Sequence, residues 1–75
     1  MSITVNGKET ELPNGASIND LILSLGLTPH RLAVELNGRI VRRANWDSTS
    51  ISEGDRVEIV HFVGGGETWN VIRDS

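Results

Sequence analysis

Two Asn-Gly dipeptides constrain the fold of this chain more than any other feature. Each dipeptide separates two short stretches in which apolar and polar residues alternate. Asn and Gly both accept the positive φ angles of a type I′ turn, so each dipeptide predicts a tight β-hairpin. The expected strand pairs are residues 2–5 with 9–12 around Asn6-Gly7, and residues 32–36 with 39–41 around Asn37-Gly38.

A single main helix is expected between the two hairpins. Ser17 is suited to cap it, and Asp20 stands where a capping box has its acid, although Asp is shorter than the usual Glu. The apolar residues at helical spacing predict one buried stripe, which consists of Ile18, Leu21, Ile22 and Leu25. Gly26 can end this helix in a left-handed conformation, and residues 28–31 predict one further helical turn.

The order of these segments predicts the fold class. After an irregular stretch at 42–52, in which Trp46 is expected to be structural, a turn at 53–55 leads into a last strand at 56–63. Strands before and after one helix predict an α+β fold, with a mixed sheet and the helix packed across one face. The arrangement that fits is the β-grasp of ubiquitin-like proteins, in which the final strand lies beside the first in the middle of the sheet.

Composition excludes several classes of function. Seven Lys and Arg residues against ten Asp and Glu give a net charge of −3, and the one basic pair, Arg42-Arg43, reads as a solvated turn, so no nucleic-acid partner is expected. No apolar stretch is long enough to span a membrane and no signal peptide is visible, so we expect a soluble, cytoplasmic protein. The chain has no cysteine, and its histidines, His30 and His61, have no ligand cluster around them in the sequence, so no metal site is expected.

The last strand runs directly into three glycines, Gly64 to Gly66. Glycine packs nothing and loses the most backbone entropy on ordering, so this run suits a segment that stays mobile or enters a narrow space. A terminal Gly-Gly is what a small protein needs if its own α-carboxylate is the reactive group. Here, however, the chain continues from Glu67 to Ser75.

Residues 1–66 resemble the ThiS family of sulfur-carrier proteins. The resemblance rests on four motifs, which are residues 33–38, residues 40–43 leading to Trp46, residues 54–60, and the closing residues 61–66. It implies that the protein is a co-substrate rather than an enzyme. The resemblance also implies a domain at 1–66, followed by a flexible extension at 67–75.

The family resemblance implies a reaction at Gly66. A ThiF-type adenylating enzyme uses ATP to activate the glycine carboxylate, and sulfur relayed from a cysteine desulfurase then replaces AMP. The resulting thiocarboxylate donates sulfur to thiazole synthase, and the carrier itself binds no cofactor. On this interpretation Gly66 carries the sulfur, while Gly65 and Gly64 let the tail thread into a partner.

The extension conflicts with this chemistry, because Gly66 is then a peptide carbonyl that cannot be adenylated. Residues 67–75 could be a propeptide, the start of a following domain such as a fused thiazole synthase, or a read-through or cloning addition. The sequence leaves these three explanations open.

The alternation of the last strand predicts a docking patch. If Val57 and Ile59 face the helix, Val60 and Phe62 share the opposite face, where apolar residues mark an interface for the partner enzymes. Val63 and Gly64 would continue that interface. The competing interpretation is a second small core under residues 42–52, closed by Trp46.

Two other functions fit the same fold. One is a MoaD-like sulfur carrier for molybdopterin or another pathway. The other is a β-grasp binding module that never carries sulfur, which is favoured by the strand-like alternation of Trp69, Val71 and Ile72 in the extension.

Overall fold

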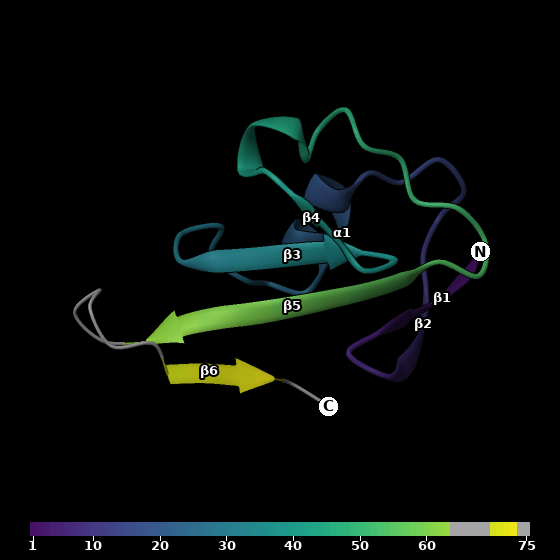
Figure 1. The fold of residues 1–75 in the computed structure, drawn as a ribbon. Coiled ribbons are helices and arrows are strands. Elements are labelled where there is room, and N and C mark those ends of the chain that lie inside the picture. The colour runs from purple at the N-terminus through teal and green to yellow at the C-terminus, as the bar shows by residue number, and fades with distance from the viewer. Residues whose placement is uncertain (64–69, 74–75) are drawn as a thin grey trace.

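The computed structural model describes residues 1–63 and 70–73, and their side chains through residue 61. In the described part of the chain, one sheet and one α-helix form the fold (Figure 1). The elements in chain order are β1 (Ser2–Val5), β2 (Lys8–Glu11), α1 (Ile18–Ser24), β3 (Leu32–Leu36), β4 (Arg39–Val41), the 3-10 helix η1 (Arg43–Asn45), β5 (Arg56–Val63) and β6 (Asn70–Arg73).

Both predicted hairpins are confirmed. Asn6 and Gly7 have φ angles of 51° and 85°, and Asn37 and Gly38 have φ angles of 53° and 87°. Positive φ at both central residues is the signature of a type I′ turn, whose twist matches that of the flanking strands. The first hairpin closes one residue earlier than expected, with Lys8 opposite Val5.

The predicted mixed sheet, with the long last strand in its middle, is also confirmed. The strand order is β2-β1-β5-β3-β4, and β6 pairs with β5 outside this path. The pairing of β1 with β5 is parallel, whereas all the other described pairings are antiparallel. β5 therefore carries the contacts that join the two hairpins into one sheet.

Helix α1 begins as the sequence predicts and ends slightly early. The Ser17 Oγ accepts the Asp20 N–H at 3.1 Å, and the Asp20 Oδ2 accepts the Ser17 N–H at 2.9 Å, so the shorter acid completes the capping box. Three stripe residues are fully buried, namely Ile18, Leu21 and Ile22. The prediction for Leu25 is wrong: this residue caps the helix after Ser24 and is 42% exposed.

The helical turn expected at 28–31 is absent from the structure. The chain bends at Pro29, Arg31 adopts a left-handed conformation with φ 64°, and β3 starts at the next residue. Leu32 is already paired with His61, and the left-handed Arg31 directly before it is incompatible with a right-handed helical turn that runs to residue 31. Tertiary pairing therefore overrides the local preference of the Thr-Pro pair.

Trp46 belongs to the main core between the helix and the sheet, not to a separate small core. Its side chain is 2% exposed, and its Nε1–H donates to the Val41 carbonyl at 2.9 Å. The core consists of Ile3, Val5, Leu12, Ala16, Ile18, Leu21, Ile22, Val34, Trp46, Ile51, Val57 and Ile59. The alternative of a second core closed by Trp46 is therefore wrong. Among the residues described, no helix is long and apolar enough to cross a membrane.

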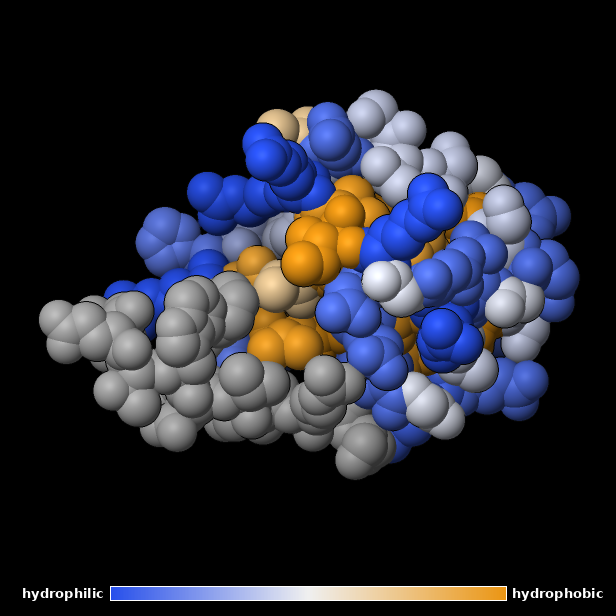
Figure 2. Space-filling model, in the orientation of Figure 1, coloured by the Kyte–Doolittle hydropathy of each residue, from blue (hydrophilic) through white to orange (hydrophobic). Residues whose placement is uncertain are grey.

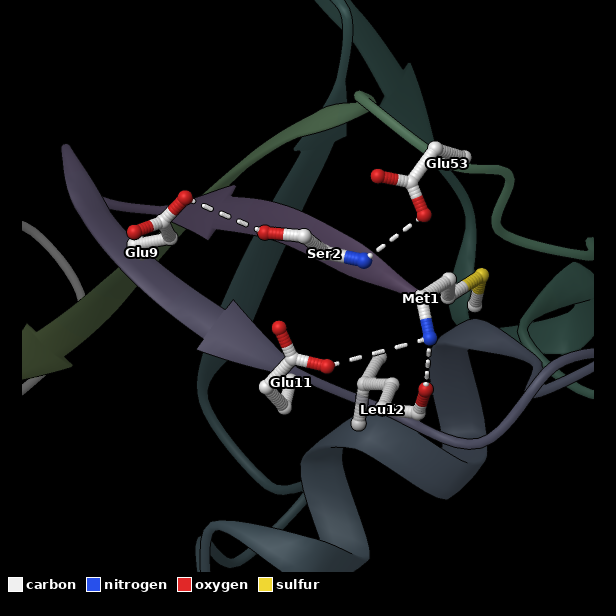
Figure 3. Close-up of polar contacts among 6 residues, drawn as sticks. All are labelled: Met1, Ser2, Glu9, Glu11, Leu12 and Glu53. Atoms are coloured by element: carbon white, nitrogen blue, oxygen red, sulfur yellow. Dashed lines mark hydrogen bonds and ion pairs between the residues drawn. The ribbon is translucent and has the colours of Figure 1, made fainter.

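Polar contacts at the start of β1 tie the loop before β5 to the sheet (Figure 3). The Ser2 N–H donates to the Glu53 Oε1 at 2.9 Å, and the Gly54 N–H donates to the Ser2 carbonyl at 2.8 Å. The Met1 ammonium donates to the Leu12 carbonyl at 2.6 Å, beyond the second strand of the hairpin. The two contacts of Ser2 place the beginning of β5 alongside β1, and the Met1 contact holds the start of β1 to the end of β2.

We expect Trp46→Phe to lower the free energy of unfolding by about 2 kcal/mol, because it removes a buried hydrogen bond and part of a filled core volume. Urea denaturation followed by circular dichroism measures this change. Ile40→Ala is the control, because the Ile40 side chain is 73% exposed and should contribute little to the core. Equal losses in the two variants would contradict the assignment of Trp46 to the core.

Candidate functional site

The candidate site is the last part of β5, which leads to the three glycines. Val57 and Ile59 are buried on the helix side, and Val60 is half-buried on the opposite face, as the alternation predicts. Phe62 and Val63 lie within β5, but their side chains are outside the described residues. The predicted tail residues Gly64, Gly65 and Gly66 also lie outside the described residues.

The two edges of β5 are occupied differently along its length. On one edge, β3 pairs with β5 continuously from Val57 to His61. On the other edge, β1 pairs only with Arg56 and Val57. Beyond Val57, β5 is therefore no longer paired with β1 of the first hairpin but is still paired with β3 of the second.

The side chain of Asn6 continues the pairing where β1 ends. Its Oδ1 accepts the Ile59 N–H at 2.8 Å, and its Nδ2 donates to the Ile59 carbonyl at 3.2 Å. The Asn6 backbone N–H donates to the Val57 carbonyl at 2.9 Å. An amide side chain thus makes both hydrogen bonds that a backbone residue of a neighbouring strand would make.

Asn37 binds the backbone of β5 on its opposite edge. Its backbone N–H donates to the Arg56 carbonyl at 2.7 Å, and its Oδ1 accepts the Arg56 N–H at 2.9 Å. Its Nδ2 donates to the Asp55 Oδ1 at 3.1 Å. The sequence indicated these asparagines for their turn geometry alone, and nothing local in the sequence revealed that both side chains reach β5.

A band of apolar side chains lies on the open face of the sheet, opposite α1. Half-buried Val60 on β5 is paired with half-buried Ala33 on β3, and Ile40 on β4 is 73% exposed. Ile40 is paired with Glu35 on β3, which is in turn paired with Glu58 on β5. These three residues form a row across the sheet next to the pair of Ala33 and Val60. Figure 2 shows hydrophobic side chains gathered where β3, β4 and β5 run together, with hydrophilic ones around them. We call Ala33, Ile40 and Val60 the open-face patch.

Sequence reasoning missed Ile40 as a surface residue, because Ile40 and Val41 are both apolar and the sequence does not show which of the two faces the core. The strand-like alternation in the extension was better founded, because Val71 and Ile72 lie in β6, while Trp69 is outside the described residues. Among the side chains described, no three of His, Cys, Asp or Glu group together in a way that could hold a metal ion.

Comparison with known proteins identifies the family. The profile of the ThiS family matches residues 2–66, which is most of the chain. The chain belongs to the ThiS family. A crystal structure of the thiamine biosynthesis protein ThiS from Geobacter metallireducens has a TM-score of 0.77 and 35% identity, and the match covers 88% of this chain and all of that one. This likeness confirms the β-grasp fold.

Two kinds of relative are similar to this member of the ThiS family. The sulfur carrier protein ThiS of Bacillus subtilis is 34% identical over 65 residues, which cover 85% of this chain and 98% of the relative. A thiazole synthase of Magnetococcus marinus is 34% identical over an alignment of 76 positions, which covers 95% of this chain. The chain spans only 23% of the length of that synthase, and 20% of the length of a second one from Paramagnetospirillum magneticum.

We expect Asn6→Asp to lower the free energy of unfolding by about 2 kcal/mol, because the carboxylate cannot donate to the Ile59 carbonyl and leaves it unsatisfied. Aspartate tolerates the positive φ of the turn, so the change isolates the lost donor. Asn14→Asp is the matched control, since Asn14 is exposed. Chemical denaturation of the three proteins measures the effect, and identical midpoints would show that Asn6 does not brace β5.

Proposed function

We propose that this protein is a sulfur carrier for thiazole formation in thiamine biosynthesis, and that the Gly66 carboxylate is its reactive group. The observation that carries the proposal is where the family match ends: it stops at Gly66, three residues beyond the end of β5. The same match supports thiazole formation over the molybdopterin alternative. It also supports a carrier that serves as co-substrate rather than as an enzyme.

The structure of β5 suits a rigid base for a reactive chain end. The strand lies in the middle of the sheet, and asparagine side chains hold it on both edges before it leaves β1. Three residues can extend about 10 Å beyond the strand. Glycines at these positions allow the backbone to enter a narrow site, because they have no Cβ.

The chemistry that we propose needs activation by a partner. A carboxylate is a poor electrophile, so a ThiF-type adenylating enzyme would use ATP to form the acyl-adenylate at Gly66. Sulfur relayed from a cysteine desulfurase would then replace AMP, and the thiocarboxylate would pass its sulfur to thiazole synthase. The carrier needs no cofactor of its own in this scheme. Because activation consumes ATP, we place the reaction in the cytoplasm.

The extension requires that the bond after Gly66 be cut before adenylation. Of the explanations for the extension, the start of a fused thiazole synthase domain is favoured by the similarity to the Magnetococcus thiazole synthase. Residues 1–66 make up 66 of 75 residues, or 88% of the chain, so a match that covers 95% continues past Gly66. In that arrangement, residues 67–75 correspond to the segment through which a carrier domain continues into a synthase.

The intact mass of the protein from its native cells tests the proposal. We expect a species that ends at Gly66, part of which is heavier by the exchange of one oxygen for sulfur. Treatment with a thiol-alkylating reagent should modify that heavier species alone, because the chain has no cysteine. If the mass always includes residues 67–75, Gly66 has no carboxylate and the carrier role fails.

We further propose that the open-face patch docks the adenylating enzyme. The patch includes Val60, which lies six residues before Gly66 on the strand that ends in the tail, so a partner seated there would receive the tail directly. Exposed apolar residues on a domain of this size are typical of interfaces. Phe62 and Val63 continue the same strand toward the tail.

We expect Ile40→Glu to weaken binding to the adenylating enzyme at least about tenfold, because a charge is expensive to bury in an apolar contact. Leu23→Glu is the matched control: Leu23 is 61% exposed but lies on α1, on the other side of the sheet. Isothermal titration calorimetry compares the affinities, and circular dichroism checks that both variants remain folded. Equal affinities for the two variants would remove Ile40 from the interface.

A further inference from the structure

The extension forms a strand on a defined edge of β5. β6 pairs antiparallel with β5 from Val60 opposite Arg73 to Val63 opposite Asn70. Because Val60 and His61 are already paired with β3 on one edge, β6 must lie on the other edge, the edge that β1 occupies farther back. Figure 1 shows β3 and β6 on opposite sides of β5.

The backbone alternation of β5 identifies the groups that meet β6. The carbonyls of Asp55 and Val57 and both backbone groups of Ile59 are directed to the β1 edge, where residues of the first hairpin bind them. Successive residues of a strand direct these groups to alternate edges. His61 and Val63 therefore present their N–H and C=O groups to β6, starting directly beyond the Asn6 amide.

We propose that the edge of β5 beyond Asn6 is a strand-acceptor site, and that residues 70–73 of this chain are its occupant. An open strand edge is a ready template for a further strand, and in this chain the extension supplies that strand. His61 lies opposite Ile72 in a position where both residues exchange backbone hydrogen bonds. β6 thus continues along β5 where the asparagine side chain stops.

This pairing has a consequence for Gly66 that rests on the proposed carrier function. Val63 is paired with Asn70, and six residues separate the two in the sequence. Gly66 is one of these six residues. A narrow channel that admits one extended strand would not admit the end of β5 while β6 is paired with it, so the extension latches the strand that leads to the tail in addition to blocking the carboxylate.

Cleavage after Gly66 would release the latch without any further step. While the chain is continuous, β6 binds β5 intramolecularly at a high effective concentration. Once the bond is cut, the four-residue strand is held only by its own contacts and is lost to dilution. One cut therefore creates the carboxylate and frees the edge of β5 together.

Two proline substitutions in the full chain test the assignment. Ile72→Pro removes the N–H that faces His61, whereas Val71→Pro removes an N–H that the same alternation directs away from β5, where proline is tolerated. Hydrogen–deuterium exchange followed by NMR is the measurement. We expect Ile72→Pro to raise the exchange rates of the His61 and Val63 amides about tenfold or more, and Val71→Pro to leave them within about twofold.

Two results of this experiment would overturn the proposal. Equal rates in the unchanged chain and both variants would mean that β6 protects nothing, and an equal rise in both variants would contradict the register. Neither result touches the carrier function, which the native mass tests separately. Conversely, a selective effect of Ile72→Pro, in a protein whose native mass never ends at Gly66, would retain the strand-acceptor site and reject the carrier function.

Discussion

The fold depends on the way in which two asparagine side chains hold the central strand. Asn6 and Asn37 each turn a hairpin with positive φ and then use the side-chain amide to bind the backbone of β5, at Ile59 and at Arg56. The same two residues therefore shape both hairpins and fasten both to β5. This economy suits a chain of 75 residues, which buries only about 60% of the surface that its unfolded form exposes.

Local signals predicted most of the architecture. The Asn-Gly turns, the Ser17 to Asp20 capping box and the alternation of β5 all encode their structure within a few residues, and all three are confirmed. The failures lie where distant parts of the chain decide the outcome. Where one helical turn is expected before β3, the chain instead passes through a left-handed Arg31 into the pairing of Leu32 with His61, and the early end of α1 exposes Leu25.

The candidate site was predicted less completely than the fold. Family motifs lead to Gly66, and the alternation of β5 places Val60 on the open face, as the structure confirms. The contribution of Ile40 depends on which strand lies beside β3, and the grip of Asn6 on Ile59 joins residues 53 positions apart. No pattern within a short window of sequence carries such information, because it arises only when the sheet is assembled.

The two turn asparagines also set a chemical lifetime for the protein. In an Asn-Gly dipeptide, the glycine offers no side chain to shield its backbone nitrogen, which can attack the asparagine amide and expel ammonia. Asn6 and Asn37 both stand in such dipeptides, and both amides are engaged with β5 or the loop before it. Each folded molecule thus restrains the groups that must rotate for this ageing reaction, whereas each unfolding event frees them. Deamidation at either turn would then record how often the sheet has opened.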